Sequence, residues 1–243
     1  MYLIIDIGNT VAKLAAFEGD RLMEVVYDEN HTLSRLPQWA AGYRFQRAIL
    51  SSVVKLPEEA EARIKALGIP VIRLDGHTPL PIEVRYETPE TLGCDRLAAV
   101  VGAQAEAPGR DLLVVDAGTC ITYELLDAQG RYWGGNISPG IRMRLKALHA
   151  FTDKLPLVEA EGRLPEMGKD TETAIRAGVM RGVEHELNGY IESLRHKYPQ
   201  LLVFLTGGDE IPFDTKLKSI IFADKFLVLK GLNHILRYNN DEI

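Results

Sequence analysis

The chain has 243 residues, enough for one large domain or two of ordinary size, and its 46% hydrophobic and 26% charged residues are typical of a soluble globular protein. The net charge of −6 argues against a general nucleic-acid binder but leaves room for one nucleotide in a locally positive pocket. No stretch has the apolar length of a membrane span, and no signal peptide precedes the first predicted strand. Because Cys94 and Cys120 form neither a disulfide framework nor a zinc pattern, we expect a cytoplasmic enzyme with reduced thiols. From the charge and the lack of an apolar span, we expect no nucleic-acid or membrane partner.

The first candidate site follows the first predicted strand. Residues 2–5 are continuously apolar, residues 11–17 are mostly apolar, and the sequence Asp6-Ile7-Gly8-Asn9-Thr10 between them predicts a tight turn. Gly8 lets the backbone approach a ligand closely, and successive N–H groups in such a turn can bind an anion. With Asp6 as a Mg²⁺ ligand and Lys13 as an amine, the turn could hold a metal-bound phosphate. An ordinary hairpin remains the alternative from this stretch alone.

The following residues predict a mixed α/β half-domain. Strands are expected at residues 22–27, 48–53 and 71–74, and helices at 33–41 and 57–67. Pro57 in the first turn and Gly68 after the last turn mark the second of these helices.

A Pro-rich loop over residues 75–92 leads into Gly93-Cys94-Asp95-Arg96, and a helix is predicted over 97–105. Asp95 would lie in the first turn of that helix, where the helix dipole favours an ionised carboxylate. An ionised carboxylate can orient a hydroxyl nucleophile, and Arg96 can bind a substrate carboxylate through two hydrogen bonds. A helix-capping acid beside a surface arginine is the alternative from the local sequence.

The pattern of the first turn recurs in the second half of the chain. Residues 112–115 form another apolar run that ends in Asp116-Ala117-Gly118-Thr119, and residues 121–126 follow as a further strand. We interpret this as an internal duplication whose two hairpins hold the phosphates of a nucleotide. It also places a domain boundary near Arg110, giving domains of residues 1–109 and 110–243.

The rest of the second half alternates strands and helices. After a strand at 131–133, Ser138 is expected to cap a helix that begins at Pro139 and buries Ile141, Leu145 and Leu148. Arg142, Arg144 and Lys146 lie off this stripe and are expected in solvent, with binding of phosphate as the alternative. A loop over 151–169 precedes a long helix over 171–197, whose apolar stripe at four-residue spacing faces the core or a partner chain. A strand at 201–205 then ends in Thr206-Gly207-Gly208-Asp209, which suits close approach of a nucleotide, and a short helix ends the chain.

Taken in order, these motifs resemble the type III pantothenate kinase family, in the superfamily that includes acetate kinase, sugar kinases and actin. The resemblance covers about residues 1–232 and rests on the Asp6–Thr10 turn with Lys13, on Gly93–Arg96, on the Asp116–Thr119 turn, on the run from Gly134 to Gly140, and on Thr206–Asp209. It implies an α/β fold of two duplicated ribonuclease H-like half-domains, the actin-like ATPase fold, with mixed sheets flanked by helices. It also implies ATP-dependent phosphorylation of pantothenate to 4'-phosphopantothenate, the first step of coenzyme A synthesis.

The resemblance assigns roles to individual residues. It implies Asp95 as the general base and Asp116 as ligand of a monovalent cation, K⁺ or NH₄⁺, although from spacing alone Asp116 could equally serve Mg²⁺. The ATP-binding residues would be Asp6, Ile7, Gly8, Asn9, Thr10, Val11, Ala12, Lys13 and Thr119, with Mg²⁺ held by Asp6 directly or through water. The pantothenate-binding residues would be Tyr86, Gly93, Cys94, Asp95, Arg96 and Thr171. Asp170 departs from the family, which has Asn there, and adds a carboxylate near an anionic substrate.

The resemblance further implies a homodimer, and we expect the apolar stripe of the 171–197 helix at its two-fold axis.

The motifs also distinguish the family from three other functions. A kinase for another small hydroxyl substrate would share the two hairpins but not Gly93–Arg96 followed by Thr171. A non-catalytic nucleotide-binding regulator would have lost the base, whereas Asp95 is present. An actin-like filament ATPase usually needs a larger chain.

Overall fold

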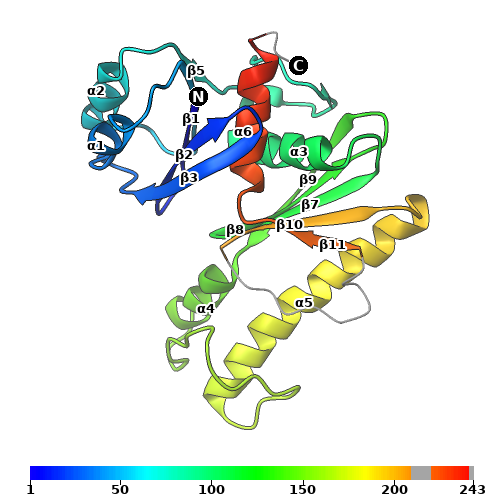
Figure 1. Cartoon of the computed structure of the whole chain (residues 1–243). Helices are drawn as coiled ribbons and strands as arrows, with labels where there is room; N and C mark the ends of the chain where they lie inside the picture. The colour runs from blue at the N-terminus through cyan, green and yellow to red at the C-terminus, as the bar shows by residue number, and fades with distance from the viewer. Residues whose placement is uncertain (209–219, 241–243) are drawn as a thin grey trace. The chain divides into compact units, whose positions relative to one another are not determined.

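The computed structural model describes residues 1–208 and 220–240, so Asp209 of the last motif lies outside the described residues. The chain forms two compact units (Figure 1). Unit 1 contains Met1–Gly109, Gln129–Trp133 and Phe226–Ile243, and unit 2 contains Arg110–Ala128 and Gly134–Lys225. These units differ from the sequence-based ranges 1–109 and 110–243 in two segments, since part of the ninth strand and the last helix belong to unit 1.

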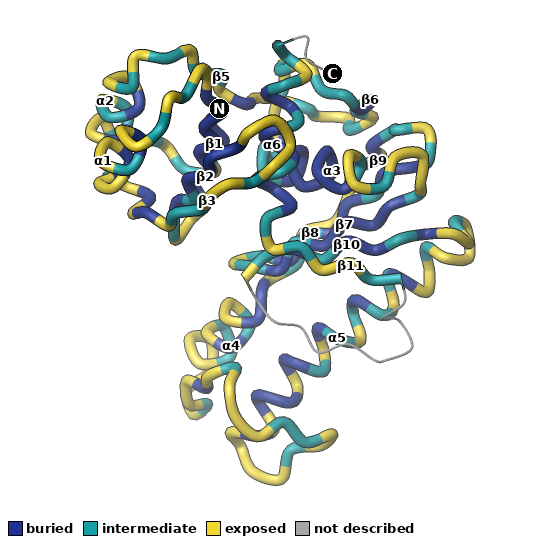
Figure 2. The backbone as a smooth tube through the Cα atoms, in the orientation of Figure 1, coloured by how far each residue is buried: buried dark blue, intermediate teal, exposed yellow. Residues whose placement is uncertain are grey.

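The sheet of unit 1 has the strand order β3-β2-β1-β4-β5. Its central strand β1 is buried along its whole length, pairs antiparallel with β2, and pairs parallel with β4 (Figure 2). The apolar runs in the sequence therefore became the inner strands of a mixed sheet, as predicted. The strands are β1 (Tyr2–Ile7), β2 (Ala12–Glu18), β3 (Arg21–Asp28), β4 (Arg47–Ser52) and β5 (Val71–Arg73).

Helices cover both faces of this sheet. One face packs on α1 (Leu36–Ala40) and α2 (Glu58–Ala66), through the odd-numbered residues Leu3, Ile5 and Ile7 of β1. The opposite face contacts α3 (Cys94–Glu106) and α6 (Leu227–Tyr238). Two helix starts differ from the prediction: α1 begins late because Leu33 has a positive φ of 52°, and Pro57 is the N-cap of α2 rather than its first helical residue.

α3 and α6 cross closely because glycines stand at the contact. A Cβ atom on Gly102 would lie 2.3 Å from the carbonyl oxygen of Leu227, and one on Gly231 would lie 1.8 Å from that of Ala98. The terminal helix is thereby fixed to unit 1. Unit 1 also contains β6 (Glu83–Val84) and a short 3₁₀ helix, η1 (Pro89–Thr91), both in the predicted loop over 75–92.

The second sheet has the order β11-β10-β7-β8-β9-β6, of which β6 and the first residues of β9 belong to unit 1. Strands β9-β8-β7-β10-β11 repeat the order of β3-β2-β1-β4-β5, with the same antiparallel hairpin and the same parallel neighbour. The predicted duplication is thus confirmed at the level of topology. The strands are β7 (Leu112–Ala117), β8 (Cys120–Leu126), β9 (Arg131–Pro139), β10 (Leu202–Gly207) and β11 (Ile221–Ala223).

Two helices cover one face of this sheet in unit 2, α4 (Ile141–Ala150) and α5 (Thr171–Lys197). The predicted stripe of α5, from Ile175 to Ile191, is buried in a core with β7, β8, β10 and α4. The expectation that this stripe forms a two-fold interface is therefore wrong, because the chain's own sheet already covers it. Among the described residues, no helix is long and apolar enough to cross a membrane.

The start of α4 also differs from the prediction. β9 continues through Pro139, and Gly140 rather than Ser138 is the N-cap. Leu145 and Ile141 are buried as predicted, and Arg142 and Lys146 are exposed. The prediction that Arg144 lies in solvent is wrong, because its side chain pairs with Glu186 of α5.

Candidate functional site

The end of β1 places Asp6 on the α3 side of the unit 1 sheet. Neighbouring residues in a strand point to opposite faces, and Ile5 and Ile7 pack toward α1 and α2. In the strand registers, Asp6 lies opposite Lys13 of β2 and Ser51 of β4. The hairpin thus brings a carboxylate, an amine and a hydroxyl together on one face.

The carboxylate of Asp6 is only 8% exposed. Burial raises the pKa of Asp6 to about 6, the charge of Lys13 lowers it, the charge of Asp95 raises it, and the hydroxyl of Ser51 lowers it. The influence of Asp95 shows that unit 1 brings together two acidic residues that are far apart in the sequence. Asp6 and Asp95 therefore lie close enough in unit 1 to influence each other electrostatically.

The turn between β1 and β2 is held from two sides. The N–H of Gly8 donates to the carbonyl oxygen of Val11 at 3.1 Å. The side-chain nitrogen of Asn30 donates to the carbonyl oxygens of Gly8 at 3.1 Å and Asn9 at 2.8 Å. Asn9 and Thr10 themselves are exposed. Sequence reasoning missed Asn30, which belongs to no motif.

The first turn of α3 presents the Gly93–Arg96 segment. Gly93 is the N-cap, and Asp95 lies in the first turn, as predicted. One carboxylate oxygen of Asp95 accepts the N–H of Arg96 at 2.9 Å, and a Cβ atom on Gly93 would lie 2.6 Å from that oxygen. Glycine thus leaves room for the carboxylate in this position, and a larger residue would displace the Asp95 side chain.

Cys94 contributes its backbone rather than its thiol to this segment. The thiol donates to the carbonyl oxygen of Leu74 at 3.0 Å. Burial, together with the charges of Asp95 and Asp75, raises the pKa of Cys94 to about 11. Because the thiolate is the reactive form, this thiol is unreactive at neutral pH.

Tyr86 and Arg96 lie together in unit 1. The guanidinium carbon of Arg96 is 5.5 Å from the centre of the Tyr86 ring, which is a cation–π geometry. The buried ring of Tyr132 stacks on Tyr86 with a centroid distance of 6.4 Å. The arginine is only 6% exposed, so its charge lies in a largely desolvated place.

The corresponding place in unit 2 has the same geometry with different side chains. In the registers, Asp116 lies opposite Thr122 of β8 and Thr206 of β10, which are the positions that Lys13 and Ser51 hold in unit 1. The N–H of Gly118 donates to the carbonyl oxygen of Cys120 at 2.9 Å and closes the turn. In unit 2, the carboxylate therefore has two threonines as neighbours. In unit 1, it has one amine, Lys13, and one serine, Ser51.

This difference bears on which cation each copy suits. No group of three or more His, Cys, Asp or Glu side chains is placed to hold a metal ion among residues 1–208 and 220–240. A cation here would have to combine one carboxylate with hydroxyl, carbonyl or phosphate oxygens, which are ligands that hard cations accept. The residues at Asp116 fit such a cation, because Thr122 and Thr206 offer oxygen rather than positive charge.

Gly207 brings β10 close to the end of β7. A Cβ atom on Gly207, whose φ is +104°, would lie 2.1 Å from the carbonyl oxygen of Ala117. The N–H of Gly208 donates to the same carbonyl at 2.9 Å. The Thr206–Gly208 motif thus lies beside Asp116.

The Thr119 turn is held from the start of α4. The N–H of Gly140 donates to the carbonyl oxygen of Thr119 at 3.1 Å. A Cβ atom on Gly140 would lie 2.1 Å from the carbonyl oxygen of Gly118, so only glycine fits. Thr119 itself is exposed.

A polar network fixes this junction to α5. Arg144 donates to the carbonyl oxygen of Pro139, to the hydroxyl of Ser138 and to Glu186, each at 2.7 Å, and Tyr123 donates to Glu186 at 2.8 Å. Burial would raise the pKa of Glu186, but the hydrogen bonds from Arg144 and Tyr123 hold it below its usual value. The ionised carboxylate therefore ties β8, β9 and α4 to α5.

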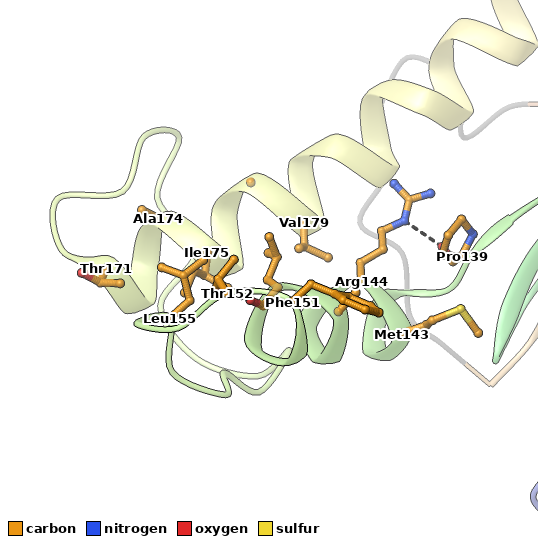
Figure 3. A pocket seen from close by; sticks show the side chains of 13 residues that line it. Pro139, Met143, Arg144, Phe151, Thr152, Leu155, Thr171, Ala174, Ile175 and Val179 are labelled. Carbon is orange, nitrogen blue, oxygen red and sulfur yellow. Dashed lines mark hydrogen bonds between the residues drawn. The ribbon is translucent and has the colours of Figure 1, made fainter.

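Thr171 lies in a different part of unit 2 (Figure 3). It begins α5, next to the capping box formed by Asp170 and Thr173. With Arg144, Phe151 and other residues of α4 and α5, it lines an open, mostly apolar groove of about 1080 Å³. Neither Asp116 nor Thr119 is among the residues that line this groove.

Comparisons with known proteins agree on one family. A sequence model of the type III pantothenate kinase family matches residues 2–193. A type III pantothenate kinase of Bacteroides fragilis is 63% identical over the full length of both chains. One from Phocaeicola vulgatus is 59% identical over 99% of each chain, and one from Porphyromonas gingivalis is 43% identical over 98% of each.

Solved structures with low sequence identity share the fold. A Campylobacter jejuni protein described as a Baf family transcriptional activator has a TM-score of 0.61 at 23% identity, covering 98% of this chain and 99% of that one. A ROK family protein from Streptococcus pneumoniae, solved with sucrose, has a TM-score of 0.53 at 10% identity, covering 99% and 100%. Together with the two mixed sheets, these likenesses confirm the predicted actin-like fold class.

The burial of Asp6 predicts that this carboxylate destabilises the protein without ligands. Because its folded pKa is raised, Asp6 contributes stability at low pH that is lost as the pH rises through about 6. We expect Asp6→Asn to raise the free energy of unfolding at pH 8, in EDTA and without nucleotide, by up to about 3 kcal/mol. Urea unfolding at pH 8, 6 and 5 should show the gain shrinking as the pH falls. Equal stability of variant and wild type at pH 8, or the same gain in the exposed control Glu18→Gln, would contradict this account.

Proposed function

Because the chain belongs to the type III pantothenate kinase family, we propose that it transfers the γ-phosphoryl group of ATP to the primary hydroxyl of pantothenate, with Asp95 as the general base. The observation that carries the assignment of residues is the grouping of Asp6, Lys13 and Asp95 in unit 1, where the pKa of Asp6 depends on both neighbours. Phosphoryl transfer needs mainly positioning and neutralisation of charge, together with a group that accepts the hydroxyl proton. The product would be 4'-phosphopantothenate, the first intermediate of coenzyme A synthesis.

We assign the phosphates of ATP to the first hairpin. Lys13 supplies positive charge, and the N–H groups of the exposed turn residues Asn9 and Thr10 donate hydrogen bonds, with Ile7, Gly8, Val11 and Ala12 as the flanking residues of the same site. The contact of Thr119 with ATP stays a prediction. Asp6 fits a Mg²⁺ ion, which would neutralise phosphate charge when bound. Asp116, with its two threonine neighbours, fits the monovalent cation, K⁺ or NH₄⁺.

We assign pantothenate to the start of α3. Arg96 is held against Tyr86 and can bind the substrate carboxylate through two hydrogen bonds. The backbone at Gly93 and Cys94 lies at the helix N-terminus, which favours an anion or a polar group. In this role Asp95 accepts the hydroxyl proton while its other oxygen stays bonded to the N–H of Arg96. Thr171 remains a proposed contact, and a cytoplasmic location remains a prediction.

A coupled assay of ADP release tests the reaction. With ATP, Mg²⁺ and pantothenate, we expect turnover that depends on pantothenate and needs K⁺, because the strand partners of Asp116 are the hydroxyl-bearing residues Thr122 and Thr206. The same assay with Na⁺ alone is the control. Turnover that ignores K⁺ would remove the cation role of Asp116, and no pantothenate-dependent turnover would favour another hydroxyl substrate or a regulator.

The role of Asp95 predicts a loss of rate without a loss of nucleotide binding. Asp95→Asn keeps an oxygen that can accept the N–H of Arg96, so the start of α3 should be preserved. We expect kcat to fall by about 10²–10⁴-fold, while the ATP dissociation constant from calorimetry changes little. Asp75→Asn, in the exposed loop before β6, is the matched control. A variant at Asp95 with a near-wild-type rate would show that another group accepts the proton.

We further propose a homodimer that forms through the groove between α4 and α5. The groove wall is largely apolar, and Phe151 on it is 87% exposed, with Met143 also exposed nearby. A second copy of the chain would cover this surface, which water otherwise contacts. We expect light scattering to give a dimer for the wild type and for Met23→Glu in β3, and a monomer for Phe151→Glu. A wild-type monomer, or a dimer of Phe151→Glu, would refute this interface.

A further inference from the structure

The loop after β3 holds the first hairpin turn through one buried side chain. Asn30 follows β3 by two residues and is only 5% exposed. Its side-chain nitrogen lies 3.1 Å from the carbonyl oxygen of Gly8 and 2.8 Å from that of Asn9. Because both neighbours are acceptors, the NH₂ end of the amide must face the turn.

Peptide geometry converts these two bonds into a direction for the N–H groups. The described residues contain no cis peptide bonds, and in a planar trans peptide the C=O of one residue and the N–H of the next point in opposite directions. When Asn30 binds the carbonyls of Gly8 and Asn9, the N–H groups of Asn9 and Thr10 must point away from Asn30. Two successive N–H groups with the same direction form a concave site for an anion.

These two N–H groups are left for a ligand. Asn9 and Thr10 are exposed and lie between β1 and β2, outside the strand pairing. Within the described parts of the chain, neither N–H donates to a protein acceptor. An exposed, pre-oriented pair of donors beside Lys13 is suited to phosphate oxygens.

The second copy of the fold holds its turn in the same way with a different donor. Gly140 directly follows β9, the strand that corresponds to β3 in the sheet order. Its backbone N–H donates to the carbonyl oxygen of Thr119 at 3.1 Å. In both units, therefore, a donor located after the third strand holds a carbonyl of the phosphate turn. That the device occurs twice argues against an accidental contact at Asn30.

We propose that Asn30 is a positioning residue for the nucleotide: its side-chain amide orients the N–H groups of Asn9 and Thr10 toward the phosphates of ATP. The inference rests on the proposed placement of those phosphates at the first hairpin. It gives Asn30 a role in ATP affinity that pantothenate affinity does not share.

The test compares Asn30→Asp with the wild-type full chain. The substitution keeps the shape of the side chain but replaces the donor with an oxygen, which cannot bind two carbonyls. We expect the KM for ATP to rise about tenfold or more, with less than about a twofold change in the KM for pantothenate. The dissociation constant of inorganic tripolyphosphate should rise by the same factor as that of ATP, because the proposed contact involves phosphate alone.

Two further variants separate this role from a general structural one. Ser34→Ala, which removes a hydroxyl bonded to Asp28 in the same loop, should leave both KM values unchanged. Asn30→Ala removes the donor without adding charge and should repeat the ATP-specific effect, measured well below its melting temperature. A lower melting temperature with equal changes in both KM values, or with none, would overturn the inference.

Lys13→Met distinguishes failure of the inference from failure of the proposed site. If Lys13→Met raises the KM for ATP and the Asn30 variants do not, the hairpin binds phosphate and Asn30 does not position it. If neither change affects ATP, the placement of the phosphates at the first hairpin is wrong, and the inference fails with it.

Discussion

The burial of a carboxylate at the end of a central strand is the constraint on which the rest of the structure depends. Asp6 is the residue before the last of β1, a strand that is buried on both faces, where an unpaired charge is costly. The fold answers with Lys13 and Ser51 on the adjacent strands, and with the start of α3 over the same face. A carboxylate in such a place weakens the protein without ligands, and its retention makes sense if it binds a cation together with a phosphate group.

Duplication of the fold gave two turns with the same backbone and different chemistry. The amine at Lys13 has a threonine, Thr122, at the corresponding position of the second unit. The donor that holds the turn is a side-chain amide at Asn30 in one unit and a backbone N–H at Gly140 in the other. Because the topology sets where the turns lie, their side chains could differ while the backbone of the two turns stayed alike.

Burial also decides which surfaces remain for other molecules. The regular stripe of α5 has the spacing of an interface, but the sheet of unit 2 already covers it. The apolar surface left in that unit lies instead in the groove between α4 and α5, with Phe151 on its wall. Periodicity indicates that a helix face is apolar, whereas only the packing shows what covers it.

The sequence by itself determined the strands that end in Asp6 and Asp116, the duplication, the first turn of α3 with Asp95, and the span of α5, because each depends on local patterns of apolar and turn residues. Gly207 was visible as a motif residue, but the close contact with the backbone of Ala117 that requires it was not. Tertiary structure alone decided that Cys94 is unreactive, that Arg144 is paired and that Gly140 caps α4. It alone showed Asn30 holding the first turn, because that role depends on contacts with residues 21 and 22 positions away, which no local pattern records.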